Sequence, residues 1–120
     1  MAMKLKEVVQ GDFRIKGTEE ETQKWLLKIK ALEARTPEGE KVKFEDIEQL
    51  IIRMTKKYKI AMQFISLTLI DNELPWYSVS VMDRENYERL TTVYGLTMYE
   101  LYAKVALFMY ATTRERNKGD

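Results

Sequence analysis

Four cations stand close together near the middle of the sequence: Arg53, Lys56, Lys57 and Lys59. The stretch between Glu48 and Asp71 contains no acidic residue, so positive charge is concentrated here although the formal net charge of the chain is only +1. Phosphates of a nucleic acid could bind this cluster, and Trp76 on a neighbouring hairpin could stack a base. The commoner role of such residues is to complement the dipole at the C-terminal end of their own helix while they stay solvated.

Two further groups of side chains could do chemistry. Asp71, Glu73 and Asp83 are the carboxylates at the ends of an expected hairpin, and oxygen ligands of this kind can hold a divalent ion. Turn and capping roles account for them more simply, so we predict no metal site. Lys104 lies in an apolar stretch, where burial would lower the pKa of its ammonium group and make it a candidate base or nucleophile. Glu100, four residues earlier, offers a plain ion pair instead.

The chain contains no cysteine and no histidine. Disulfides, thiolate catalysis and cysteine-based zinc sites are therefore excluded, as are imidazole ligands and triads that use histidine as the general base. The sequence also contains no glycine-rich phosphate loop and no nucleophile elbow. We predict a protein without catalytic residues or cofactor, a small accessory or regulatory protein of the kind that viruses and mobile elements encode.

The length of 120 residues corresponds to one domain with a single hydrophobic core. We predict a compact domain over residues 1–120, with a frayed tail at 117–120. The longest apolar segment, residues 98–111, contains two charges and is shorter than the ~20 residues that a membrane span needs. The N-terminus lacks the apolar region of a signal peptide, so the expected location is the cytoplasm, without membrane contact.

The clearest element of the first half is a helix. Apolar residues recur at helical spacing from Phe44 to Tyr58 and form one continuous stripe. Acidic residues occupy the first turn and basic residues the last, as the helix dipole favours. We therefore predict a helix over residues 44–58, and only a weak hairpin signal, around Gly11 and Asp12, near the N-terminus.

Residues 19–43 permit two interpretations. Thr18 and Glu21 have the spacing of a capping box, and the residues that follow favour a helix over residues 19–35 with a loop after it. The alternative is a β-hairpin, in which a strand over residues 26–34 would pair with the segment beyond the Pro-Gly turn. Both interpretations stay open at the level of the sequence.

A β-hairpin is expected at the centre of the chain, with strands over residues 60–70 and 76–82. One face of this hairpin should carry the apolar residues Ala61, Ile65, Leu67, Leu69, Tyr77, Val79 and Val81. The other face carries small hydroxyl side chains, which let a helix approach closely or leave the face wet. After the hairpin, Asp83 is expected to cap a helix over residues 84–94 that Gly95 ends.

The junction before the last helix has the most specific local pattern in the chain. Thr97 can cap the helix, Glu100 completes a capping box, and Leu96 with Leu101 has the spacing of a hydrophobic staple. The last helix should therefore begin at Met98. A DNA-reading helix-turn-helix is another interpretation of this junction, but the second helix lacks the polar and basic side chains that reach base edges.

The last helix, which should end near Arg116, is apolar around most of its circumference over residues 98–111. A surface helix buries about a third of its circumference. Either the domain surrounds this helix with its own elements, or part of the helix contacts another chain, where tyrosine rings cover area while their hydroxyls stay wet. The predicted interface residues are Tyr99, Tyr102, Leu107, Met109 and Tyr110.

Together these elements predict an α+β fold: a small antiparallel sheet around the hairpin of residues 60–70 and 76–82, with three to four helices packed mainly on one face. The predicted function is a non-catalytic protein-interaction module that forms a homodimer, binds a protein partner, or both. The second hypothesis is a nucleic-acid-binding accessory protein that uses Arg53, Lys56, Lys57, Lys59 and Trp76.

Overall fold

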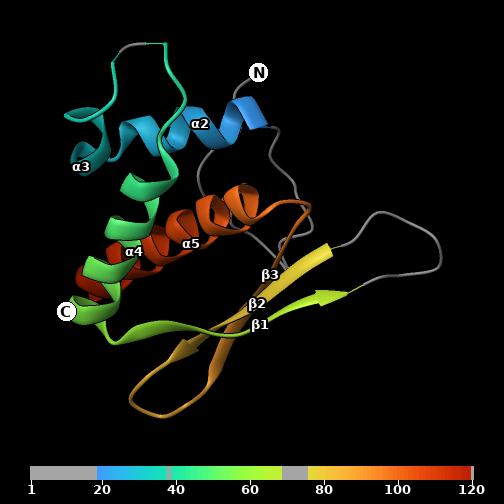
Figure 1. Ribbon diagram of the computed structural model, residues 1–120. Helices are drawn as coiled ribbons and strands as arrows, with labels where there is room; N and C mark the ends of the chain where they lie inside the picture. Colours follow the sequence, from blue (N-terminus) through green and yellow to red (C-terminus); the bar gives the residue numbers. More distant parts are fainter. Residues whose placement is uncertain (1–18, 38, 69–75, 120) are drawn as a thin grey trace.

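The computed structural model describes residues 19–37, 39–68 and 76–119 and has the predicted α+β fold. The elements of the described chain are α2 (Glu19–Lys28), α3 (Lys30–Glu33), α4 (Phe44–Tyr58), β1 (Ile60–Thr68), β2 (Trp76–Asp83), β3 (Arg89–Gly95) and α5 (Met98–Gly119). The strands form an antiparallel sheet in the order β1-β2-β3, and these helices lie on one side of it (Figure 1). The hairpin expected around Gly11 and Asp12 lies outside the described residues.

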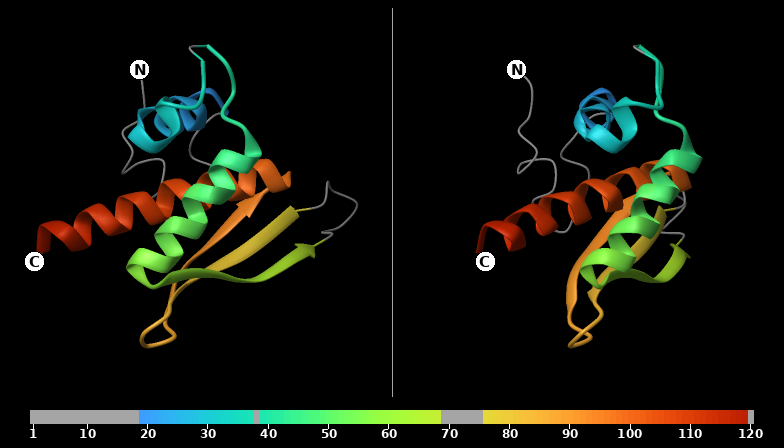
Figure 2. Two further views of the ribbon diagram at one scale, coloured as in Figure 1. Left: turned by 60° about the vertical axis from the view of Figure 1, so that its left-hand side comes forward. Right: turned by 90° about the vertical axis from the view of Figure 1, so that its left-hand side faces the viewer.

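Helix α5 is the centre of the packing. It contacts α2, α4 and the strands β2 and β3, and Figure 2 shows it between α2 and the sheet. The side chains of Leu101, Val105, Leu107 and Met109 are fully buried there. The apolar circumference that the sequence left unexplained is thus covered largely by the chain's own elements.

Helix α5 spans Met98–Gly119. The frayed tail expected at 117–120 stays a prediction.

Helix α4 spans the predicted residues, Phe44–Tyr58. Its apolar stripe is buried, and consists of Ile47, Leu50, Ile51 and Met54. The helix ends at Tyr58 and is capped by Lys59, whose left-handed φ of 56° turns the chain directly into β1. Arg84 holds this end in place, because its guanidinium donates to the carbonyl of Thr55 at 3.4 Å and its N–H donates to the carbonyl of Lys59 at 2.7 Å.

Residues 19–37 and 39–43 form helices and loop segments, and the expected strand over residues 26–34 is mostly helical, so the competing β-hairpin is excluded. The helix is interrupted at Ile29, where φ of −77° and ψ of 113° are extended values, and it restarts as α3. Leu26, Ile29 and Leu32 are buried on both sides of this break, so the apolar face continues across it. The loop that follows is linked to α4 by an ion pair between Arg35 and Asp46, with 3.6 Å between the charged atoms.

Residues 89–95 form a third strand, and the predicted helix over residues 84–94 was wrong. In the pairing of β3 with β2, Val93 lies opposite Val79, and both side chains are buried. The strand contains Thr91, Thr92, Val93 and Tyr94. β-Branched and aromatic side chains of this kind favour a pleated, half-buried strand over a helix.

Local hydrogen bonds explain why a helix was expected. The Asp83 carboxylate accepts the N–H of Glu85 at 2.9 Å, which is the bond that a helix-capping aspartate makes. The Asn86 side chain then accepts the N–H of Glu88 at 3.0 Å, and the Asp83 N–H donates to the Glu88 carbonyl at 2.8 Å. Tyr87 takes a φ of 59°, so the chain reverses into a hairpin instead of continuing as a helix.

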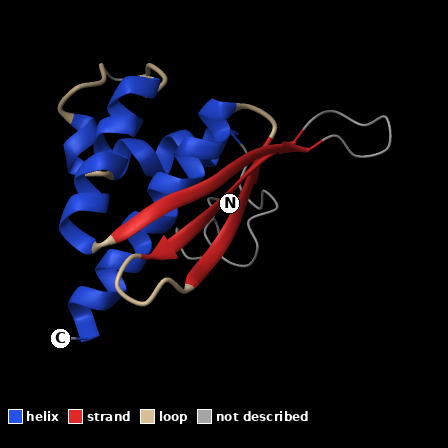
Figure 3. Cartoon of the chain, turned by 60° about the horizontal axis from the view of Figure 1, so that its bottom comes forward, coloured by secondary structure: helices blue, strands red, loops and turns tan. Residues whose placement is uncertain are grey.

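A bulge in β1 changes which of its residues face the helices. Met62 pairs with the buried Val81, so its neighbour Ala61 points to the opposite face of the sheet. The register then shifts between Gln63 and Ser66, and Ile65 is 46 % exposed. The prediction that Ala61 lies on one face with Val81 was wrong, because alternation counted along the sequence does not account for the extra residue of a bulge. Figure 3 shows the three strands side by side with the helices packed behind them.

Candidate functional site

Tyr99, a predicted interface residue, links α5 to α2 and to the loop before α4. Its hydroxyl accepts a hydrogen bond from Nε2 of Gln23 at 2.8 Å and donates to the backbone carbonyl of Val42. The Val42 N–H donates in turn to Oε1 of Gln23 at 2.9 Å. The ammonium of Lys41 lies 4.1 Å from the centre of the Tyr99 ring, which is a cation–π distance. The Tyr99 side chain is therefore engaged within its own domain.

The other predicted interface residues divide into two groups. Leu107 and Met109 are fully buried, so they have no surface in the folded chain with which to contact a partner. Tyr102 is half-buried and packs on Phe44, with 4.9 Å between the ring centres. Tyr110 is half-buried and lines a cleft that is described below. Among the predicted interface residues, only the tyrosines therefore keep surface that could contact a partner. Self-association stays a prediction.

Lys104 is buried with 2 % of its surface exposed. Its ammonium donates to Oε1 of Glu100 at 2.9 Å and to the carbonyl of Tyr94 at 3.1 Å. Burial lowers the pKa of Lys104 below its ordinary value of 10.5, while the hydrogen bond and the charge of Glu100 oppose this shift. The other Glu100 oxygen accepts the N–H of Leu96 at 2.8 Å, so the pair holds the turn between β3 and α5 in place. These contacts give Lys104 a structural role.

The basic cluster and Trp76 are not brought together. Arg53, Lys56 and Lys57 are exposed on α4, whose end leads directly into the first residue of β1. Trp76 begins β2 at the other end of the hairpin, where it pairs with Thr68. Asp83 pairs with Ile60, the first residue of β1, and lies seven residue steps along the strand from Trp76, which is about 23 Å. The backbone of Trp76 thus lies far along the sheet from the end of α4, and the combination of these cations with Trp76 as a base-stacking platform stays a prediction. Lys59, the fourth cation, is ion-paired with Glu85 at 2.9 Å.

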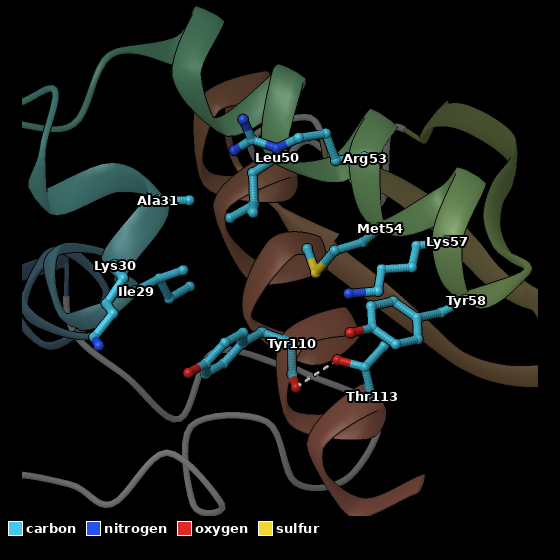
Figure 4. Close-up of a pocket in the computed structure, with 10 residues that line it drawn as sticks. All are labelled: Ile29, Lys30, Ala31, Leu50, Arg53, Met54, Lys57, Tyr58, Tyr110 and Thr113. Carbon is cyan, nitrogen blue, oxygen red and sulfur yellow. Dashed lines mark hydrogen bonds between the residues drawn. The ribbon is translucent and has the colours of Figure 1, made fainter. Parts of the chain in front are cut away.

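A cleft of about 400 Å³ opens where α3, α4 and α5 meet (Figure 4). The buried side chains of Ile29, Leu50 and Met54 form its apolar floor. Tyr58 and Tyr110 stand at its sides, and Figure 4 shows the Tyr58 hydroxyl pointing into the hollow. A concave and mainly apolar surface with a few polar groups is typical of binding sites.

Three cations stand around this floor: Lys30 of α3, and Arg53 and Lys57 of α4. No acidic residue is among the described residues that line the cleft, and none of the three cations makes an ion pair with another described residue. The Lys57 ammonium lies 5.3 Å from the centre of the Tyr58 ring and points into the hollow in Figure 4. The described part of the chain thus leaves the positive charge of the cleft without a neutralising carboxylate.

The sequence indicated part of this cleft but not the whole. Arg53 and Lys57 belong to the basic cluster that it singled out, and the apolar stripe of α4 indicated that Leu50 and Met54 are buried. Lys30 and Ile29 were missed because they come from the region whose conformation was ambiguous, and no local pattern indicates that α3 meets α4 and α5.

Neither a metal site nor a membrane span is found among the described residues. No three side chains of the types His, Cys, Asp and Glu come together there in a group that could hold a metal ion, and no described helix has the length and apolar character to cross a bilayer. Asp71 and Glu73, two of the carboxylates considered above, lie outside the described residues. Comparison with protein-family models, with curated proteins and with solved structures finds no match for this chain, so its function is argued from the site alone.

Proposed function

We propose that the protein is a non-catalytic binding module that docks a partner protein in the cleft between α3, α4 and α5. The observation that carries this proposal is the combination of an apolar floor with three cations that lack carboxylate partners among the described residues. An apolar surface surrounded by charged groups is the usual composition of a protein docking site, in which burial supplies affinity and charge supplies specificity.

The cleft favours a different partner over a second copy of the chain. The case for a homodimer was that a domain of this size could not cover an apolar last helix by itself. The structure weakens that case, because Leu101, Leu107 and Met109 are fully buried within one chain. We therefore place the docking surface at the cleft and regard self-association as the second possibility for this class of function.

Nucleic-acid binding is the second candidate function. It is supported by Arg53, Lys56 and Lys57, which are exposed on α4 and have no ion pair among the described residues. Such binding would be steeply salt-dependent, because each phosphate contact releases condensed counterions. It would also be weakened by Lys56→Glu and by Lys57→Glu alike, whereas cleft binding depends on Lys57 alone of these two.

Photo-crosslinking from the cleft tests the proposed function. A benzophenone amino acid is placed at Ala31, which lines the cleft and is half-buried, and in a matched variant at Tyr87, which is exposed at the tip of the β2–β3 hairpin. We expect a defined protein adduct from position 31, in cells that produce the protein, and none of the same mass from position 87. Identical adducts from both positions, or none from position 31, would contradict the proposal.

A further inference from the structure

We infer that the segment docked in the cleft is an amphipathic α-helix with acidic residues beside its apolar face. This inference rests on the proposed function, because it specifies which kind of protein segment the cleft accepts. It is drawn from three properties of the cleft: its apolar floor, the secondary structure of its lining, and the spread of its cations.

The floor selects an apolar face. Ile29, Leu50 and Met54 belong to the core of the domain, yet they also form the bottom of the cleft. These three side chains are only 4–5 % exposed, so most of the apolar surface that a partner can cover belongs to the half-buried Ala31, Tyr58 and Tyr110, which also line the cleft. Covering this surface removes it from water, which is the main driving force for association. Leu, Ile or Met side chains of the partner are the chemical match for this floor.

The lining selects a helix over an extended strand. Extended peptides obtain much of their affinity from main-chain hydrogen bonds to a free sheet edge. None of the described residues that line the cleft belongs to a strand; they come from α3, α4 and α5 and from Ile29 at the break before α3. Backbone groups inside a helix are already paired. A helical partner needs no main-chain bonds from the cleft, because its own backbone is paired as well, and it presents side chains at i, i+3, i+4 and i+7 to the groove.

The cations select an acidic segment instead of a single small anion. Lys30 comes from α3, whereas Arg53 and Lys57 come from α4. Figure 4 shows the Lys57 ammonium pointing into the hollow, the Arg53 guanidinium extending past Leu50 at one margin and the Lys30 ammonium pointing away from the hollow at the opposite margin, so the three charges do not converge on one point. One carboxylate or phosphate could meet only part of this charge. Several carboxylates spaced along both sides of an apolar helix face would meet all three.

Binding of a synthetic helix tests the inference. The probe is a fluorescent peptide of about 18 residues, long enough to form a helix, with leucines on one face and glutamates on both flanks of that face. Its matched control has glutamine in place of every glutamate. By fluorescence anisotropy at low salt, we expect the glutamate peptide to bind the full chain about tenfold more tightly than the glutamine peptide, since each charge pair adds a modest amount.

Variants of the full chain locate the binding. We expect Lys57→Glu to lower the affinity for the glutamate peptide by about tenfold and to change the affinity for the glutamine peptide by less than about twofold. Lys56→Glu is the matched control, because Lys56 is exposed in the same turn of α4 but does not line the cleft. Ala31→Phe fills the cleft without removing any charge, so it should weaken the binding of both peptides. Circular dichroism of each variant checks that it is folded.

Several results would overturn the inference. Equal binding of the two peptides, or equal losses with Lys56→Glu and Lys57→Glu, would show that the cleft does not select acidic segments. A short oligonucleotide or dodecyl phosphate that binds with the same Lys57 dependence, while neither peptide binds, would identify a different kind of occupant. If position 31 still crosslinks to a protein but the two peptides bind alike, the proposed function stands and only the acidic helix is wrong. If both experiments fail, both proposals are wrong.

Discussion

Lys104 and Glu100 form the most buried ion pair among the described residues, at the turn between β3 and α5. The lysine is almost fully buried, and Glu100 neutralises its charge while accepting the N–H of Leu96. Removing one partner of such a pair leaves an uncompensated charge, which costs more than removing both. Both side chains were noted in the sequence as an i,i+4 pair, but only their burial makes the pair important for stability.

The pH dependence of stability should reveal the environment of Lys104. Its pKa in the folded chain is lowered by burial, whereas in the unfolded chain it returns to its ordinary value of 10.5. As pH rises toward 10.5, the folded state loses this proton before the unfolded state does. The unfolded state then binds more protons than the folded state, so the free energy of unfolding increases with pH and the fold becomes more stable. We expect the wild type to gain stability relative to Lys104→Met as the pH rises toward 10.5 in urea denaturation. Parallel curves for the two proteins would contradict this.

Removing Glu100 tests the same pair at neutral pH. Glu100→Ala leaves the Lys104 ammonium without its counter-charge and the Leu96 N–H without its acceptor, and should lower the free energy of unfolding by about 2 kcal/mol. Glu85→Ala is the control, because Glu85 forms an exposed pair with Lys59 and should cost no more than about 0.5 kcal/mol. Chemical denaturation measures both, and equal effects would show that burial of the Lys104 pair adds nothing.

At the scale of elements, the β3–α5 junction decides how the last helix meets the sheet. Thr97 Oγ1 accepts the N–H of Glu100 at 3.1 Å, as the capping box predicted, but the Glu100 carboxylate reaches the N–H of Leu96 instead of that of Thr97. Leu96, the expected staple partner, is 38 % exposed, whereas Leu101 is fully buried. The cap is therefore combined with a tight turn directly after β3.

Gly95 is required in this turn because of space. A Cβ atom at this position would lie 2.8 Å from the backbone nitrogen of Leu101, a distance that real Cβ atoms do not adopt. The obstacle is main chain of α5, so it cannot move aside as a flexible side chain would. We expect Gly95→Ala to lower the free energy of unfolding by about 2 kcal/mol. Thr92→Ala, a half-buried position in the same strand, should cost less than about 1 kcal/mol, and thermal unfolding compares the two. Equal losses would contradict the steric explanation.

At the scale of the whole molecule, the sheet and the helices other than α5 enclose the apolar last helix, and the cleft lies on the side of α4 that faces α3. Three cations of two helices are gathered there around an apolar floor. This arrangement links the fold to the proposed docking function, because the same side chains that complete the core also form the bottom of the cleft.

The mass of the isolated protein in solution tests how completely the chain covers α5. Since Leu107 and Met109 are buried within one chain, we expect light scattering to give the mass of a single chain over a range of concentrations and at both low and high salt. A stable dimer that is insensitive to salt would contradict this expectation. In that case the half-buried Tyr102 and Tyr110 would again be candidate residues of a dimer interface.

Local patterns in the sequence determined much of this fold. The stripe from Phe44 to Tyr58, the central hairpin, and the start of the last helix at Met98 were all predicted correctly, because spacing and capping act over a few neighbouring residues. The same local information identified Arg53 and Lys57 as exposed cations.

Only the tertiary structure decided the rest. Asp83 makes the hydrogen bond of a helix cap, yet pairing with β2 turns the following residues into β3, because the partner strand satisfies their backbone and buries Val93. The bulge in β1 sets which residues face the core, and it depends on the register with β2. The cleft exists because α3 places Lys30 and Ile29 against α4 and α5. Each of these outcomes depends on contacts between segments far apart in the chain, which spacing along the sequence does not specify.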